Sequence, residues 1–146
     1  MRIAIGCDPN ATQEKEHLKA VLESLKHDVV DFGSDDPIYA NTAIAVAEYV
    51  ASGKADRGVL ICGTGLGMTI SANKVKGAYA ALLADSYSAE RSIKSNNANI
   101  ACFGAFTLGP KVMEGLLREW LGYEYKPGTP SEAKVSRYVE YDMSRR

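Results

Sequence analysis

The stretch Val59-Leu60-Ile61-Cys62-Gly63-Thr64-Gly65-Leu66-Gly67-Met68 decides the fold. Its apolar run is typical of a buried strand, and the run ends in a cysteine, after which three glycines alternate with other residues. Glycine has no β-carbon, so backbone amides can approach a ligand closely. The first amides of a helix lack internal partners and attract negative charge. The stretch therefore predicts a strand, a tight turn and a helix start, with a thiol beside an anion-binding nest formed by residues 63–67.

Four further apolar segments are interpreted as strands, and amphipathic segments separate them. The predicted strands are residues 2–7, 28–32, 58–61, 78–83 and 98–102. Apolar strands that alternate with helices are typical of βαβ units and a parallel sheet. At 146 residues the chain is the size of one domain. We therefore expect an α/β fold with a five-stranded parallel sheet in a single domain, residues 1–146.

Chemistry-bearing residues follow several of these strands. Asp8, Cys62, Asp85 and Phe103-Gly104 all come just after an apolar segment. Ligands of open parallel sheets bind at the carboxyl ends of the strands. We expect these residues to share one edge of the sheet.

Two helices carry specific expectations. Residues 10–12 can cap a first helix, on which Leu18, Val21, Leu22 and Leu25 fall on one face. Ser131 caps a final helix, within residues 127–146, that no strand follows. Its face of Val135, Tyr138 and Val139 must be buried somewhere, and a partner subunit is a reasonable place.

Composition excludes several classes of partner. The net charge is −1, whereas nucleic-acid and membrane surfaces favour a basic excess. The start of the chain is too short and too soon interrupted for a signal peptide, and no apolar run is long enough to span a bilayer, so the cytosol is the expected location. The three cysteines have no CxxC spacing, which argues against a disulfide framework and a metal site.

The glycine-rich turn matches no common phosphate-binding motif. Its third glycine comes one residue too early for G-x-G-x-x-G, and it lacks the ending of a P-loop. A plain turn between strand and helix is the alternative. Cys62 could be a buried packing residue, but unpaired amides favour a thiolate there, which could act as a base or a nucleophile. We interpret Cys7 and Cys102 as packing residues.

Two polar positions remain open on pattern alone. Asp8 could cap a helix, or it could orient the hydroxyls of a ligand. The pair Asn96-Asn97 could close a helix, or its amides could bind a polyol.

Six motifs in register resemble the type B ribose-5-phosphate isomerase and galactose-6-phosphate isomerase family. They are Gly6-Cys7-Asp8, Ile61 to Gly67, Ala72-Asn73-Lys74, Tyr87 to Arg91, Ser95 to Ala98, and Phe103-Gly104. The resemblance runs from Met1 to about Tyr125. It implies a Rossmann-like three-layer sandwich and an aldose–ketose isomerase that uses neither a metal nor a cofactor. It also implies a homodimer or tetramer with active sites shared between subunits.

The resemblance also assigns roles to single residues. Cys62 would move a proton between C1 and C2 of the sugar, while Thr64 would add its hydroxyl. The amides of Gly63, Gly65, Leu66 and Gly67 would hold the enediolate oxygens. Asp8 and Tyr39 would contact sugar hydroxyls, and Asn96 would reach the neighbouring subunit's site. We further expect that Gly65→Val would fill the space of the ligand.

The sequence departs from the family pattern at the positions that open a sugar ring. The family usually has histidine directly after the first Asp, where this chain has Pro9, or at the positions of Ala84 or Ser95. The only histidines of this chain are His17 and His27, and they lie at none of these positions.

The residues that grip the phosphate are altered as well. Phe106 stands where the family pattern after the fifth strand has arginine. Only Lys134 and Arg137 remain as cations near the start of the last helix, and they could equally be a solvated face. Ribose 5-phosphate is the substrate by family. A tetrose 4-phosphate, which cannot close a furanose ring, and another sugar with Phe106 as an apolar wall are the alternatives.

Two other functions stay open. The chain could bind a sugar phosphate without catalysis, as a sensor or as the partner subunit of a hetero-oligomeric isomerase. It could also use Cys62 as a covalent nucleophile.

Overall fold

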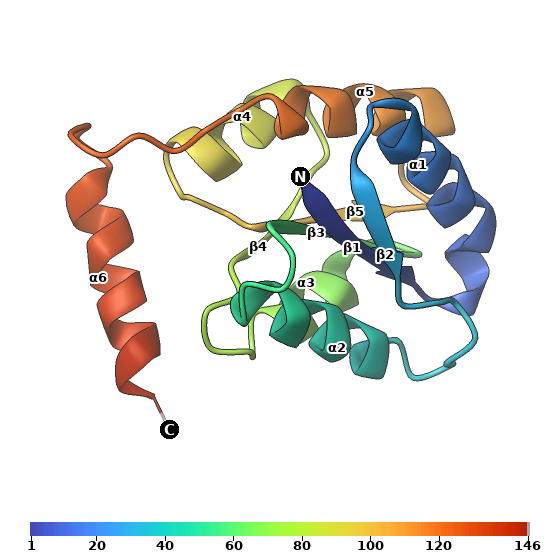
Figure 1. Cartoon of the computed structure of the whole chain (residues 1–146), viewed down its shortest axis with the longest axis horizontal. Helices are drawn as coiled ribbons and strands as arrows, with labels where there is room; N and C mark the ends of the chain where they lie inside the picture. Colours follow the sequence, from blue (N-terminus) through green and yellow to red (C-terminus); the bar gives the residue numbers. More distant parts are fainter. Residues whose placement is uncertain (146) are drawn as a thin grey trace.

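The computed structural model describes residues 1–145 as five strands and six α-helices around one sheet (Figure 1). The strands are β1 (Arg2–Cys7), β2 (Asp28–Asp31), β3 (Arg57–Cys62), β4 (Ala80–Leu82) and β5 (Ile100–Gly104). The helices are α1 (Thr12–Ser24), α2 (Tyr39–Ala51), α3 (Leu66–Ala72), α4 (Ser86–Lys94), α5 (Pro110–Leu121) and α6 (Glu132–Ser144). Within residues 1–145, no helix combines the length and apolar character that crossing a membrane requires.

All strand pairs are parallel, and their order is β2-β1-β3-β5-β4. From β1 the chain goes first to β2 on one side and later to β3 on the other. The order therefore reverses between β1 and β3, which creates a crevice at their carboxyl ends, the usual ligand site of such sheets.

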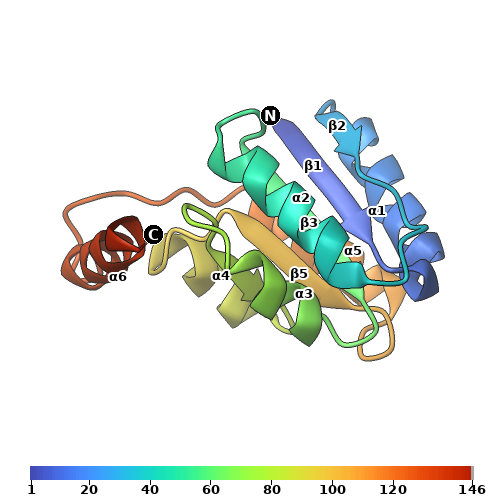
Figure 2. The ribbon, with the colours of Figure 1, turned by 90° about the horizontal axis from the view of Figure 1, so that it is seen from below.

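Helices cover both faces of the sheet, as the two views show (Figures 1 and 2). On one face the buried side chains of β1, β3 and β5 pack with those of α1, α4 and α5, including Leu18, Ile93 and Trp120. On the other face they pack with α2 and α3, including Val46 and Met68. The predicted α/β fold with a five-stranded parallel sheet and the three-layer sandwich are both confirmed.

The alternation along β3 decides where the thiol points. Val59 and Ile61 belong to the core beneath α1, α4 and α5, whereas Leu60 and Cys62 belong to the core beneath α2 and α3. Successive side chains of a strand face opposite sides of the sheet. Cys62 therefore lies at the carboxyl end of β3 on the α2–α3 side.

Some predicted boundaries were wrong. Strand β5 begins and ends two residues later than predicted, so Phe103 and Gly104 belong to it. The N-cap position of α1 is Ala11, within the predicted residues 10–12, but it makes no side-chain capping hydrogen bond; the Asp8 side chain instead caps the 3-10 turn at Pro9–Ala11 that precedes α1. Leu25 directly follows the last residue of α1 and is exposed, because the helix ends before it could continue the apolar face.

Helix α6 stands apart from the sheet but contacts its own chain (Figure 1). Val135 is buried, and the Tyr138 ring lies 5.8 Å from the Tyr79 ring, centroid to centroid. The buried Asp142 carboxylate accepts hydrogen bonds from the Gly77 amide and the Tyr79 hydroxyl, each at 2.8 Å. The predicted apolar face is thus covered in part within one chain. Packing of α6 on a partner stays a prediction.

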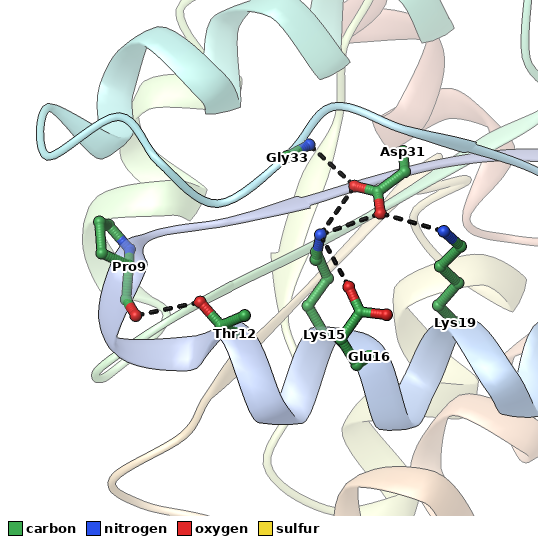
Figure 3. A network of polar contacts seen from close by, with 7 residues as sticks. All are labelled: Pro9, Thr12, Lys15, Glu16, Lys19, Asp31 and Gly33. Carbon is green, nitrogen blue, oxygen red and sulfur yellow. Dashed lines mark hydrogen bonds and ion pairs between the residues drawn. The ribbon is translucent and has the colours of Figure 1, made fainter.

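An ion pair between a buried lysine and a partly exposed carboxylate joins α1 to the end of β2 (Figure 3). Lys15 Nζ lies 2.9 Å from both carboxylate oxygens of Asp31, and the Lys15 side chain is only 4% exposed. The Asp31 carboxylate also accepts from the Gly33 amide at 2.8 Å and from Lys19 Nζ at 3.3 Å. The Cys7 amide in turn donates to the Gly33 carbonyl. The network therefore holds the start of the loop that leads to α2 in place against the end of β1.

We expect Asp31→Asn to lower the free energy of unfolding by about 1–2 kcal/mol near neutral pH, because it removes charge-assisted hydrogen bonds from a buried lysine whose other charge partner, Glu16, is exposed. Burial alone would raise the pKa of Asp31, but the hydrogen bonds from Lys15 and Gly33 outweigh it and lower that pKa. The stabilisation is thus fully present above the ordinary value of 3.8 and is lost as pH falls through the lowered pKa. Urea unfolding at several pH values measures this.

The control is Asp35→Asn, which changes an exposed carboxylate in the following loop. Its free energy of unfolding should stay within about 0.5 kcal/mol of the parent protein. Equal effects of the two substitutions, or a pH-independent loss in Asp31→Asn, would contradict the assignment.

Candidate functional site

The site lies at the carboxyl edge of the sheet, where β1 and β3 end side by side. Asp8 follows β1 and its amide donates to the Ile61 carbonyl at 3.1 Å. Cys62 closes β3 and pairs in register with Gly104 on β5. Asp85 begins α4 after β4, where it accepts a hydrogen bond from the Ser88 amide. The expectation that these residues share one edge is confirmed.

The Cys62 thiol is held by the nest. Its sulfur accepts a hydrogen bond from the Gly65 amide at 3.1 Å, and the residue is 4% exposed. Thr64 Oγ1 accepts from the Leu66 amide at 3.3 Å. The thiol and the hydroxyl therefore each accept a hydrogen bond from an amide of the nest, and these are groups that could serve proton transfer and oxyanion binding.

Gly65 shapes the nest from inside the protein. Its φ of +78° is in the left-handed region that favours glycine. A methyl group at this position would lie 2.5 Å from Leu82 Cδ1 and 2.9 Å from the carbonyl carbon of Phe103. The expectation that a side chain at Gly65 fills the ligand space was therefore wrong. Such a side chain would push the nest off β5, because it points into the core.

Two aromatic side chains stand at the two ends of the nest. The Phe106 ring lies against Gly63, where an added methyl group would be 2.9 Å from two of the ring carbons. The Tyr39 hydroxyl lies against Gly67 and occupies the space that a methyl group would need there. One end of the nest is therefore bounded by a phenyl ring and the other by a phenol.

The carboxylate of Asp8 is buried beside this nest. Its Oδ1 accepts a hydrogen bond from the Asn10 amide at 2.7 Å, so the cap interpretation is confirmed. Within residues 1–145, the other oxygen, Oδ2, accepts no hydrogen bond. The capping role therefore leaves one oxygen for a ligand hydroxyl, and the two interpretations are compatible.

The other two thiols have different surroundings. Cys7 and Cys102 are fully buried in the two cores, and burial raises the pKa of each thiol to about 12. Neither group can ionise near neutral pH. Both are packing residues, as the sequence predicted.

Three predicted site residues lie far from Cys62 in a single chain. Asn96 lies between α4 and β5, before the amino end of β5, and Lys134 and Arg137 lie on α6, which stands on the side of the sheet where the strands begin (Figure 1). The Tyr138 hydroxyl donates to the Asn96 carbonyl, and the Asn96 side chain donates to the Arg91 carbonyl at 2.8 Å. One chain therefore does not bring the two groups of predicted residues together.

Neither histidine is at the carboxyl edge beside Cys62. His17 Nε2 on α1 lies 3.0 Å from Glu114 Oε1 on α5. His27 precedes β2 and its Nδ1 lies 3.0 Å from the amino group of Met1. Residues 1–145 also contain no cluster of three or more His, Cys, Asp or Glu side chains that could hold a metal ion.

Sequence reasoning missed what supports the nest. Gly104 lets the backbone of Thr64 approach β5, since a methyl group on Gly104 would lie 2.7 Å from the Thr64 carbonyl carbon. The glycine at the end of a strand was the available signal. Nothing in the sequence indicated that Leu82 packs behind Gly65 or that Phe106 covers Gly63.

Comparisons with known proteins agree on one family. The family model described as Ribose/Galactose Isomerase matches residues 3–138. D-erythrulose-4-phosphate isomerase 2 of Mycolicibacterium smegmatis is 45% identical, with 97% of each chain covered. Ribose-5-P isomerase B of Listeria innocua is 44% identical, with 100% of each chain covered.

A solved structure extends the agreement to the fold. Ribose-5-phosphate isomerase B of Clostridium thermocellum superposes with a TM-score of 0.92 at 36% identity, covering 98% of each chain. The nest and thiol at the carboxyl edge, the family model and this likeness give one conclusion: the chain belongs to the ribose/galactose isomerase family and is an aldose–ketose isomerase of sugar phosphates.

Proposed function

We propose that this protein interconverts a tetrose 4-phosphate and its 2-ketose through a cis-enediolate, with Cys62 as the base. The observation that carries the proposal is a thiol held in an amide nest at an edge of the sheet that has no histidine. Erythrulose 4-phosphate is the substrate in the name of the relative that is 45% identical.

The reacting end supports proton transfer between carbons. The Cys62 thiolate takes the proton from C2 of the aldose, and the electrons of that bond form the C1=C2 double bond. The charge that develops on O1 faces the amides of the nest, which are fixed before the reaction. The proton on O2 moves to O1, and the thiol then returns its proton to C1. Thr64 and Asp8 hold the hydroxyls during these steps.

The lack of a histidine beside Cys62 fits a substrate that stays in its open-chain form. Five-carbon aldose phosphates close a furanose ring through the C4 hydroxyl, and opening that ring needs a proton to move to the ring oxygen. In a tetrose 4-phosphate the same oxygen carries the phosphate, so no such ring forms. The site then needs the carbon base alone, which is what Cys62 supplies.

The residues at the amino edge complete the site of a second subunit in this proposal. Asn96 follows α4, and Lys134 and Arg137 lie on α6, whereas Cys62 closes β3 at its carboxyl end. In a homodimer with shared sites, or in a tetramer built from such dimers, one chain supplies the thiol and the other supplies the amide and the two cations for the phosphate. Residues 127–146 then form the segment that contacts the partner, in a single-domain cytosolic enzyme.

Ribose 5-phosphate is the second candidate substrate. It is favoured by the relative of Listeria innocua, which is 44% identical over its whole length. Because the two relatives differ so little in identity, the local chemistry has to decide between them.

We expect Cys62→Ala to lower kcat by about a thousandfold or more, because loss of a general base typically costs a factor of this size. The variant should keep its melting temperature and oligomeric state. The control is Cys7→Ala, which removes a buried thiol that cannot ionise and should retain activity. Turnover by Cys62→Ala at the wild-type rate would eliminate both the proposed base and a nucleophilic role for this thiol.

A panel of aldose phosphates with four, five and six carbons tests the substrate. We expect the highest kcat/KM with erythrose 4-phosphate, because it needs no ring opening. Formation of the matching ketose phosphate is followed by enzymatic or chromatographic assay. A higher kcat/KM for ribose 5-phosphate would replace the first candidate with the second, and inactivity with every sugar would support a non-catalytic subunit.

Mixing two inactive variants tests the shared site. Cys62→Ala and Asn96→Ala should each lose activity alone. After joint refolding, half of the dimers are mixed and each has one intact site, so activity should recover to about a quarter of the wild-type value in a twofold assembly. If the mixed dimers form but stay inactive, each site takes Cys62 and Asn96 from the same chain, and the shared site is contradicted.

A further inference from the structure

A cavity of about 860 Å³ lies between the C-terminal half of α4 and the segment that joins α5 to α6. Its volume is within the range of sites for small molecules. Three cationic side chains, Arg91, Lys94 and Lys126, line the cavity, and within residues 1–145 Glu124 is the only acidic residue of the lining. Positive groups therefore outnumber negative ones here, although the whole chain has a net charge of −1. The cavity is suited to an anion.

Arg91 is the side chain of this cavity that is best prepared to bind an anion. Its Nη1 donates to Ser95 Oγ at 2.9 Å, and its Nη2 donates to Glu90 Oε1 at 3.0 Å. Its Nε is buried and has no acceptor within residues 1–145, although the side chain as a whole is 38% exposed. A buried donor without a partner is unfavourable. An anion that accepted a hydrogen bond from Nε would satisfy this donor, and guanidinium groups bind phosphate through two N–H groups at once.

One carboxylate competes with such an anion. Glu90 contacts both cations of α4, since its Oε1 lies 3.0 Å from Arg91 Nη2 and its Oε2 lies 3.6 Å from Lys94 Nζ. The Glu90 side chain is 33% exposed. Ion pairs between exposed side chains contribute little. A phosphate dianion can therefore compete with Glu90 for the same two cations.

The cavity adjoins the residues that the proposed shared site takes from one chain. The Asn96 side chain donates to the Arg91 carbonyl at 2.8 Å, and Ser95, which Arg91 contacts, stands at a position where the family pattern can have histidine. The lining reaches the residue before α6, the helix that carries Lys134. No thiol is part of the lining within residues 1–145. A sugar whose phosphate lay here would need Cys62 of a second chain as its base.

We propose that Arg91 is a further phosphate-binding residue of the shared site and replaces the arginine that the family pattern has at the position of Phe106. This inference rests on the proposed function. The substrate phosphate is held in the cavity of one chain, while C1 and C2 lie at Cys62 of its partner. Arg91 supplies the bidentate hydrogen bonds that a lysine cannot supply, and Lys126 adds a second positive charge to the cavity.

The first experiment measures kcat/KM for the aldose phosphate that the wild type converts fastest, and the inhibition constant of inorganic phosphate. A hydrogen bond to a charged group contributes a factor of about ten to a hundred in binding. Arg91→Gln should therefore lower kcat/KM and raise the inhibition constant by about tenfold or more, with competitive inhibition in both proteins. Arg91→Lys should recover only part of this loss. The control is Arg118→Gln on α5, because Arg118 also pairs with a glutamate of its own helix but does not line the cavity.

A variant with the opposite expected effect accompanies this series. Glu90→Gln removes the competing carboxylate and should lower the inhibition constant of phosphate by about threefold, the size typical of an exposed ion pair. Weaker inhibition by phosphate in Glu90→Gln would contradict the inference. So would an unchanged kcat/KM in Arg91→Gln, and so would inhibition that is not competitive, because the cavity would then be separate from the substrate site.

Mixed dimers test which chain supplies Arg91. Arg91→Gln is refolded with a large excess of Cys62→Ala, so that almost every Arg91→Gln chain has a Cys62→Ala partner. The one active site of such a dimer takes Cys62 from the first chain and Arg91 from the second, and its KM should equal that of the wild type. A KM as high as that of Arg91→Gln alone would overturn the inference.

The proposed function and this inference fail in different ways. A preference of the wild type for ribose 5-phosphate would contradict the tetrose substrate, but the effect of Arg91→Gln on kcat/KM would still test Arg91. Inactivity with every sugar would contradict the proposed reaction. Calorimetric titration with inorganic phosphate then tests Arg91: weaker binding to Arg91→Gln than to the wild type supports the phosphate site, and equal binding overturns it.

Discussion

The close contact between Gly65 and β5 is the constraint on which the site depends. The α-carbon of Gly65 lies so near the backbone of Phe103 and the side chain of Leu82 that no β-carbon fits between them. Because Gly65 is held there in a left-handed conformation, its amide points back to the Cys62 sulfur. Because Gly65 has no side chain, the turn can pack closely on β5, and its amide is directed at the Cys62 sulfur. Gly104 extends the same contact to Thr64.

The sheet order explains why these groups meet. The chain reverses its direction of winding between β1 and β3, so Asp8 and Cys62 end up on neighbouring strands although more than fifty residues separate them. The Lys15–Asp31 pair then holds the β2 end against α1, close to the loop that leads to Tyr39. The contacts that stabilise the fold here, the strand pairing and the Lys15–Asp31 ion pair, therefore also place the residues of the site.

The sequence predicts well whatever depends on neighbours along the chain. Strand periodicity located β1 and β3, and the position of Asp8 and Cys62 after them was enough to predict a common edge. The direction of the Gly65 α-carbon, the ring of Phe106 on Gly63 and the Tyr39 hydroxyl on Gly67 could not be predicted, because each depends on a contact between distant segments. The cap at Asp8 is a local contact with the Asn10 amide, which the pattern could suggest but could not separate from a ligand role.

Hydrogen bonds between Asp142 and the segment before β4 hold α6, which carries two residues of the proposed shared site. Burial would raise the pKa of Asp142, but hydrogen bonds from Gly77 and Tyr79 outweigh it and lower that pKa, so the carboxylate is ionised at neutral pH. Burial and the same carboxylate raise the pKa of Tyr79 to about 12, which keeps its hydroxyl a donor.

The hydrogen bond from Tyr79 to Asp142 ties α6 to the start of β4, and the hydrogen bond from Tyr138 to the Asn96 carbonyl ties it to the segment that follows α4. Lys134, Arg137 and Asn96 are therefore carried by elements that are fastened to one another on their own chain. A partner that received any one of these side chains at its thiol would receive the others from the same rigid group. In the shared site that we propose, each subunit would therefore supply its half as one connected group.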